Sequence, residues 1–141
     1  MRKKSFFILL VIGNMLTAEA QEKKEETSNN PFFQPYNTPF NVPPFDLIKN
    51  EHFKPAILEG IKKHDAEINA IANATAAPSF DNTILAMENA GKLLSNVNVV
   101  FSNLNSANTN KELQNIAKEV APSLSAHRDN IYLNAKLFAR E

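Results

Sequence analysis

The spacing of apolar side chains is the feature that most constrains this chain of 141 residues. From Phe53 onward, apolar residues recur at steps of three and four, which is the spacing of one face of an α-helix. No alternating apolar and polar stretch of useful length appears, and Gly60 and Gly91 are the only glycines after the first twenty residues. The pattern therefore predicts an all-α fold.

The first predicted helix begins near Asn50, a plausible N-cap, and ends before the 73–78 connection. Pro55 falls in its first turn, where a missing amide proton costs least. Pro78 closes the connection, because the residue before a proline is disfavoured in helical conformation. The apolar face of this helix comprises Phe53, Ile57, Ile61, His64, Ile68 and Ile71.

A second, continuous helix is expected from its cap at Ser79 to about Leu104. Its apolar face comprises Phe80, Ile84, Met87, Leu94, Val97, Phe101 and Leu104, and Leu93 and Val100 widen it. The apolar arc covers about half of the helix circumference. Such an arc indicates neighbours on two sides, and we expect that part of the partner surface lies outside this chain.

The third predicted helix follows a stretch rich in turn-forming residues at 103–109. Thr109 and Glu112 have the spacing of a capping box, in which each side chain satisfies the other residue's free amide. The apolar face is Leu113, Ile116, Ala117, Val120, Leu124 and Ile131. Pro122 is expected to kink or split this helix. A last amphipathic turn, 133–138, is expected to be cut off at the end of the sequence.

Residues 1–20 have the organisation of a secretory signal peptide. Basic residues at 2–4 precede an apolar run at 6–16, and Ala18 and Ala20 place small side chains at a cleavage site. We expect cleavage after Ala20 and a periplasmic or secreted protein. The apolar run is about half of the ~20 residues that a spanning helix needs, so no permanent membrane anchor is expected.

The mature chain would carry 12 basic and 14 acidic residues, a formal charge of −2. This balance provides no strong field for nucleic acid or an anionic membrane, and neither is expected as a partner. Residues 21–30 are polar and charged, which is typical of a flexible linker. Residues 31–45 interleave prolines with aromatics, which predicts an extended segment. We expect it to pack along the protein's own helices rather than to serve as a proline-rich ligand for a partner.

No complete catalytic or metal-binding motif is legible in the sequence. The chain has no cysteine, and none of His52, His64 and His127 has the His-Glu-x-x-His spacing that places two imidazoles on one helix face. We expect His64 to pack within the first helix, and His52 and His127 to be boundary residues. The acidic residues Asp46, Glu51 and Asp81 are expected at helix starts. The asparagines at 96–110 are expected mainly in caps and turns, with a polar groove as the alternative.

Several long strings, however, resemble the start of bacterial peptidyl-dipeptidases, which are zinc metallopeptidases of the thimet-oligopeptidase type; oligopeptidase A is the close relative to distinguish. The strings are NPFFQPYNTPFNVPPFDLIKNEHFKPAILEGIKKHDAEINAI, APSFDNTILAMENAGKLL, FSNLNSANTNKELQNIAKEVAPSLSAH and NIYLNAKLFARE. They cover the chain from about residue 30 to its end.

The resemblance implies that residues 46–141 are the helical N-terminal region of a large, clam-like, monomeric enzyme with a peptide channel. It implies zinc held by a His-Glu-x-x-His helix and a later glutamate, and oligopeptide substrates that lose C-terminal dipeptides. No residue of this chain matches those catalytic or zinc-binding positions, so we expect a truncated and inactive segment that binds no cofactor. The alternative is a secreted, non-catalytic helical module that binds peptides or other partners.

Overall fold

The computed structural model describes residues 29–140, and this part of the chain is all-α without a β-strand. Residues 1–28 and 141 are outside the description, so the expected signal peptide and most of the expected linker are not covered. The α-helices are α2 (Phe53–Ala72), α3 (Ala86–Asn89), α4 (Lys92–Ala107), α5 (Lys111–Tyr132) and α6 (Ala135–Phe138). Short 3-10 turns at Pro31–Phe33 (η1), Pro39–Asn41 (η2) and Asn50–His52 (η3) precede α2, and a π-helical turn, Asp81–Leu85 (η4), precedes α3. None of the described helices is long and apolar enough to cross a membrane.

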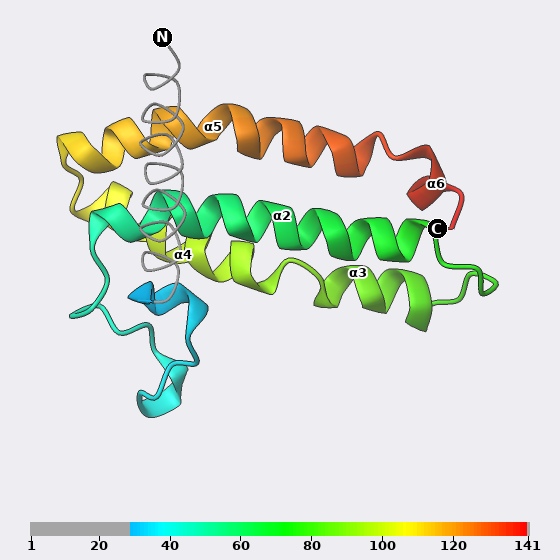
Figure 1. Ribbon diagram of the computed structural model, residues 1–141, viewed down its shortest axis with the longest axis horizontal. Coiled ribbons are helices and arrows are strands. Elements are labelled where there is room, and N and C mark those ends of the chain that lie inside the picture. Colours follow the sequence, from blue (N-terminus) through cyan, green and yellow to red (C-terminus); the bar gives the residue numbers. More distant parts are fainter. Residues whose placement is uncertain (1–28, 141) are drawn as a thin grey trace, which may run out of the picture.

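The central helix is α2, which packs against α4 on one side and α5 on the other (Figure 1). The main core lies between these three helices and confirms most of the predicted apolar faces. Its buried residues are Phe32, Phe53, Ala56, Ile57, Leu94, Val97, Val100, Phe101, Leu113, Ile116 and Val120. The Phe53 side chain is fully buried, and its ring lies 5.4 Å from that of Phe32 and 5.1 Å from that of Phe101, between ring centres. Aromatic contacts of this kind add to the stabilisation from apolar burial.

Gly60 allows α2 and α4 to approach closely. A Cβ atom at this position would lie 2.9 Å from the Cα of Leu94, which is closer than carbon atoms pack. Because backbone atoms of α4 occupy the space, any larger residue at position 60 would push the two helices apart.

The second predicted helix is not continuous, and this prediction was wrong. Ala90 is extended, and Gly91 has φ 68°, in the left-handed region, so the chain turns there between α3 and α4. As a result, the start of the predicted apolar face does not join the core: Phe80 is 68% exposed and Ile84 lies at the surface. The prediction failed because the apolar spacing continues on both sides of Gly91, where the structure interrupts the helix.

Caps predicted from the sequence are partly confirmed. Ser79 caps its segment as expected, since its hydroxyl accepts from the amide of Asn82 while the Asn82 side chain accepts from the amide of Ser79. The predicted capping box of Thr109 is wrong, because the N-cap of α5 is Asn110, whose side chain accepts from the amide of Leu113 at 2.9 Å. Asn50 also does not cap α2; it opens the 3-10 turn η3.

Pro122 lies inside α5 without splitting it. The helix runs unbroken from Lys111 to Tyr132, so of the two predicted effects, splitting is excluded.

The proline and aromatic segment packs on the helices in its first half only. Phe32 is buried, and Phe33 and Tyr36 pack against the core. The second half projects from the helices as the loop around η2, where Phe40 is 98% exposed. The segment is therefore extended apart from two short 3-10 turns, and our expectation that it packs along the helices holds for about half of it.

Asn30, the last residue of the expected linker, is buried rather than solvated. Its side chain accepts from the amide of Phe32 at 3.1 Å and donates to the carbonyl of His52 at 2.9 Å. These two bonds fix the start of the aromatic segment to the start of α2, so Asn30 is not part of a flexible linker.

The short helix α6 packs against the far end of α2. Leu137 joins Ile68 and Ala72 in a second, smaller core. Arg140 donates to the carbonyl of Ala74 at 2.9 Å and to the side chain of Asn82 at 3.1 Å. Contrary to the expectation that the chain stops within a helix, α6 ends at Phe138, and Arg140 lies in a turn.

Candidate functional site

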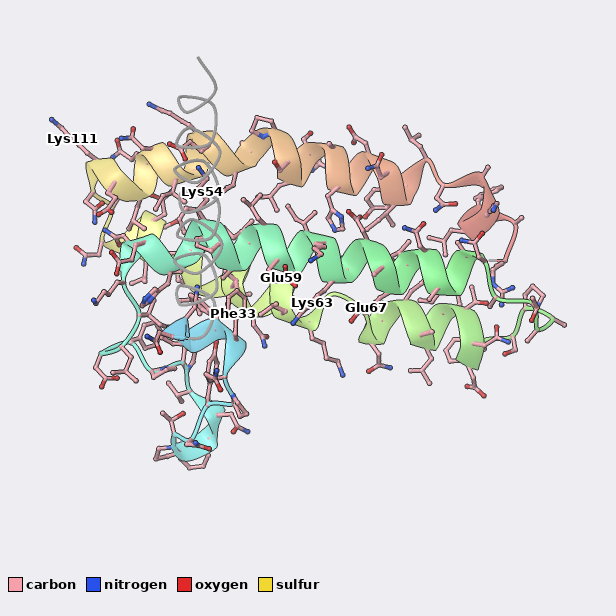
Figure 2. The ribbon with its side chains drawn as sticks, in the orientation of Figure 1. Phe33, Lys54, Glu59, Lys63, Glu67 and Lys111 are labelled. Atoms are coloured by element: carbon pink, nitrogen blue, oxygen red, sulfur yellow. The ribbon has the colours of Figure 1, made fainter. Side chains whose placement is uncertain are left out.

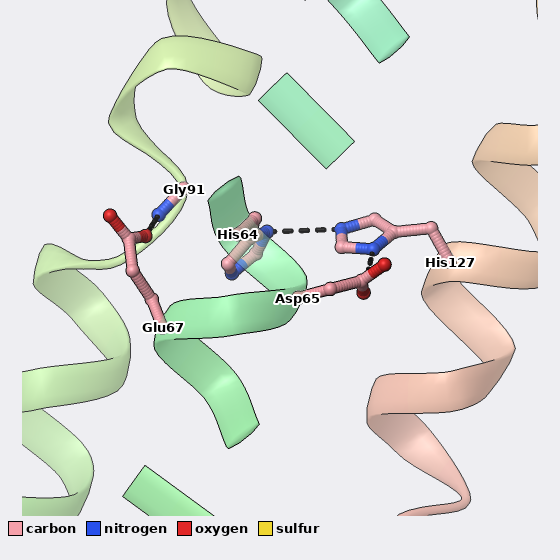
Figure 3. A network of polar contacts seen from close by, with 5 residues as sticks. All are labelled: His64, Asp65, Glu67, Gly91 and His127. Carbon is pink, nitrogen blue, oxygen red and sulfur yellow. Dashed lines mark hydrogen bonds and ion pairs between the residues drawn. The ribbon is translucent and has the colours of Figure 1, made fainter. Parts of the chain in front are cut away.

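A chain of hydrogen bonds between α2 and α5 is the most distinctive polar feature of the described residues (Figure 3). The Nδ1 atom of His127 lies 2.6 Å from an oxygen of Asp65, and its Nε2 atom lies 3.0 Å from Nδ1 of His64. The two imidazole rings are tilted by 59°, with their centres 4.9 Å apart. His127 is buried and Asp65 is partly exposed, so this chain reaches from the interior to the surface.

The carboxylate fixes the tautomer of His127. An ionised carboxylate only accepts hydrogen bonds, so Nδ1 of His127 must donate to Asp65. In the neutral ring, Nε2 then has a free lone pair and accepts from Nδ1–H of His64. Asp65 thereby orients both imidazoles, one directly and one through its neighbour.

The turn between α3 and α4 supports the other side of His64. A Cβ atom at Gly91 would lie 2.7 Å from Nδ1 of His64, so the imidazole occupies space that only a glycine leaves open. The amide of Gly91 donates to a carboxylate oxygen of Glu67 at 2.7 Å (Figure 3). Glu67 belongs to a line of charged residues at four-residue steps along α2, after Glu59 and Lys63 (Figure 2). Glu67 of α2 thus fixes the turn at Gly91, and this turn leaves room for His64 of the same helix.

The two histidines lie at a surface cleft of about 420 Å³ between α5, the turn before α4, and α2. Apolar and polar side chains both contribute to its lining. The residues that line it include Ile68, Met87, Leu94 and Ile131, together with Glu88, Ser95, Asn98, Arg128 and Tyr132. A cleft of this size and composition could hold a small ligand or a side chain of a partner protein.

Burial lowers the pKa of His64 from its ordinary value of 6.5, and the neighbouring His127 lowers it further, while Glu67 and Asp65 act in the opposite direction. Burial also lowers the pKa of His52, at the other end of α2. Near neutral pH, His64 is therefore an uncharged imidazole.

A nucleophilic catalytic site needs a nucleophile, a histidine base and a carboxylate that orients the base, and the network of Asp65, His127 and His64 contains only the last two. A carboxylate that orients a histidine is the base half of a catalytic triad. The atom next to Nε2 of His127 is, however, a nitrogen of His64 rather than a hydroxyl or thiol. Within residues 29–140 there is also no group of three or more histidine, aspartate and glutamate side chains that could hold a metal ion. These residues do not fit the zinc that the resemblance implies.

Sequence reasoning placed two of the three histidines correctly. His64 packs in the face of the first helix as expected, and His52 lies at a boundary, where its ring accepts from the amide of Lys49. The expectation that His127 is a boundary residue was wrong, since it is 6% exposed. Its position three residues after Leu124 and four before Ile131 continues the apolar face, and that spacing could have revealed it.

The remaining expectations concern acidic residues and asparagines. Asp81 and Glu51 lie in the first turns of short helices as expected. Asn110 is a cap, whereas Asn98 lines the cleft, so both readings of the asparagine-rich stretch hold in part. The carboxylates of Asp65 and Glu67, which organise the site, were not singled out from the sequence.

Comparisons with known proteins agree with the resemblance seen in the sequence strings. The chain is 45% identical over 113 residues to a dipeptidyl carboxypeptidase of Salmonella typhimurium, and 44% identical over 114 residues to one of Escherichia coli. The chain is therefore similar in sequence to part of the bacterial dipeptidyl carboxypeptidases, which are also called peptidyl-dipeptidases. The matches cover 80% and 81% of this chain but 17% of each relative, so the chain spans about a sixth of their length. No protein-family model matches it.

Proposed function

We propose that this chain is part of the N-terminal helical region of an exported zinc peptidyl-dipeptidase, which removes C-terminal dipeptides from oligopeptides. The identity to two dipeptidyl carboxypeptidases over four fifths of the chain supports this proposal. The chain's own all-α fold agrees with a helical enzyme of that kind.

In this proposal, the chain contributes structure and the rest of the enzyme contributes the chemistry. Zinc would be held by the two histidines of a His-Glu-x-x-His helix and a further glutamate outside residues 1–141, and the glutamate of that motif would activate water for attack on the peptide carbonyl. Helices α2, α4 and α5 would form part of the wall of the peptide channel. The exposed apolar residues Phe80, Val99 and Phe138 would then lie against other parts of the enzyme.

The location of the protein is part of the same proposal. The basic residues, apolar run and small residues of positions 1–20 favour export by a signal peptide that is then removed. The mature enzyme would act on peptides in the periplasm or outside the cell, as a monomer.

The experiment is a product analysis with the protein expressed from the complete gene. An N-terminally blocked tetrapeptide is incubated with the purified protein, and the products are identified by mass spectrometry. We expect a free C-terminal dipeptide, loss of activity on chelation, and recovery when zinc is added. The same peptide with a C-terminal amide is the matched control, and it should be cleaved much more slowly.

Two outcomes would contradict the proposal. Release of single amino acids, or cleavage at internal bonds of longer peptides, would indicate a different peptidase specificity. Binding of peptides without any hydrolysis, at any zinc concentration, would favour the non-catalytic helical module instead.

A further inference from the structure

The hydrogen-bond chain between α2 and α5 can hold a limited number of protons. With both histidines neutral, His64 donates to Nε2 of His127, which donates to Asp65. One added proton is accommodated by reversing one bond: His127 then carries both of its protons, and Nε2–H donates to Nδ1 of His64. In both states, the two ring nitrogens of His127 and Nδ1 of His64 each have a hydrogen-bond partner.

A second added proton breaks the arrangement. Nδ1 of His64 and Nε2 of His127 would both carry hydrogen and face each other across 3.0 Å, with no acceptor between them. Two positive rings would also lie with their centres 4.9 Å apart. Both the lost hydrogen bond and the charge repulsion favour separation of the rings.

The surrounding charges do not remove this conflict. On α2, Asp65 is already bonded to His127, and Glu67 is bonded to the amide of Gly91. From α3, Glu88 lines the cleft, and α5 contributes Arg128 and Tyr132. The residues that α4 contributes to the lining, Leu94, Ser95 and Asn98, carry no charge. The charged side chains of the cleft lining, apart from the histidines, are therefore one carboxylate and one guanidinium. The lowered pKa of His64 agrees with resistance to the second proton.

The two halves of α5 are held to α2 in different ways. Leu113, Ile116 and Val120, in the first half, belong to the main apolar core and do not titrate. In the second half, the buried contact is His127 itself, and Leu124 and Ile131 are only partly buried. Separation of the histidines would thus loosen the second half, between the main core and the smaller core at Leu137, while the first half stays in place.

We propose that Asp65, His127 and His64 form a proton-operated latch. It holds the C-terminal half of α5 against α2 while the two histidines carry at most one added proton, and it releases that half and widens the cleft when both are protonated. The latch depends on contacts within this chain and is independent of the proposed peptidase activity.

Amide hydrogen exchange of the whole chain, followed residue by residue by NMR, tests the latch. Protection factors, corrected for the intrinsic effect of pH on exchange, are measured from about pH 8 to about pH 5, across the usual histidine range. We expect protection in residues 124–132 to fall by up to about tenfold per pH unit once the second proton binds, because opening takes up one proton. At every pH, amides in the core of α4, at 97–101, should stay better protected than those at 124–132, because the latch opens without unfolding that core.

His64→Gln is the decisive variant. Its amide group donates to Nε2 of neutral His127 and accepts from protonated His127, so the hydrogen bond survives in both states. We expect the acid-induced loss of protection at 124–132 to disappear. His52→Gln is the matched control, because it removes a histidine with a lowered pKa at the other end of α2 and should leave the loss unchanged.

Two results would overturn the latch: an unchanged loss of protection in His64→Gln, or wild-type protection at 124–132 that does not depend on pH. Should the variant fail to fold, the tautomers of the unaltered chain decide the question. Nitrogen-15 shifts at about pH 8 should show the proton on Nδ1 of both His127 and His64. A proton on Nε2 of His127 would contradict the proposed chain of bonds.

Discussion

At the scale of single residues, Gly91 is the position that the fold can least exchange. Its φ of 68° is costly for any residue with a side chain, and His64 fills the space in which a Cβ would lie. Its amide also bonds to Glu67, which fixes the turn to α2. Three separate requirements therefore meet at one glycine.

Replacing Gly91 with alanine should lower the free energy of unfolding by about 1–3 kcal/mol, through backbone strain and displacement of the His64 ring. Urea denaturation followed by circular dichroism measures this. The neighbouring Lys92→Ala, at an exposed helical position, is the control and should remain within about 0.5 kcal/mol of the unaltered chain. Equal stability of the two variants would contradict the close packing of His64 on Gly91.

Sequence reasoning at this scale recognised apolar positions well and polar contacts poorly. Phe53 and Ile57 could be assigned to the core because spacing alone decides which side of a helix they share. The bonds of His127 to Asp65 and His64 span 62 and 63 residues, and helical spacing says nothing about which residues of two distant helices meet. The histidine network therefore required the tertiary structure.

At the scale of helices, two neighbouring residues, Thr109 and Asn110, are candidates for the N-cap of α5. The sequence favoured Thr109 with Glu112, whereas the structure gives the capping role to Asn110. The hydroxyl of Thr109 instead bonds to the side chain of Asn105 at the surface. Both residue types are good caps, so the choice depends on the exact register of the first turn.

Asn110→Ala should cost about 1 kcal/mol in the free energy of unfolding, because the amide of Leu113 loses its acceptor. Thr109→Ala is the matched control and should cost clearly less, since its bonds are exposed side-chain contacts. The reverse order of the two effects, measured by thermal or urea unfolding, would show that the cap predicted from the sequence is the true one.

The positions of α2 and α5 could be predicted because long runs of regular spacing leave little ambiguity. The division between α3 and α4 could not, since Gly91 occurs within a pattern that continues on both sides of it. A glycine inside a helical pattern is usually tolerated at a modest cost, so its presence alone did not indicate a break. The bond from Glu67 and the position of His64 make the break the better arrangement.

At the scale of the whole molecule, the core around Phe53 holds the aromatic segment, α2 and α4 together. Phe53→Ala should lower the free energy of unfolding by about 3–5 kcal/mol, because a fully buried ring leaves a cavity. Phe138→Ala, at a side chain that is 77% exposed, should change it by less than about 0.5 kcal/mol. A small effect of the first substitution, measured by urea unfolding, would contradict a common core for these elements.

Global stability should decrease in mild acid. The pKa values of His64 and His52 are lowered in the folded chain, so the unfolded chain binds protons first as the pH falls through 6.5. The stabilisation is complete above that value and is lost progressively below it. Urea unfolding at several pH values measures the slope, and the double variant His52→Gln/His64→Gln should have a shallower one. An identical slope in both proteins would contradict the assignment.

The central claim is that this chain is a helical segment of a peptidyl-dipeptidase, and the coding sequence that follows the codon of Glu141 tests it most directly. Our account predicts an open reading frame that continues and encodes a His-Glu-x-x-His segment followed by a further glutamate. A stop codon at this position, with no such segment in any downstream frame, would contradict the account and would favour a non-catalytic helical module.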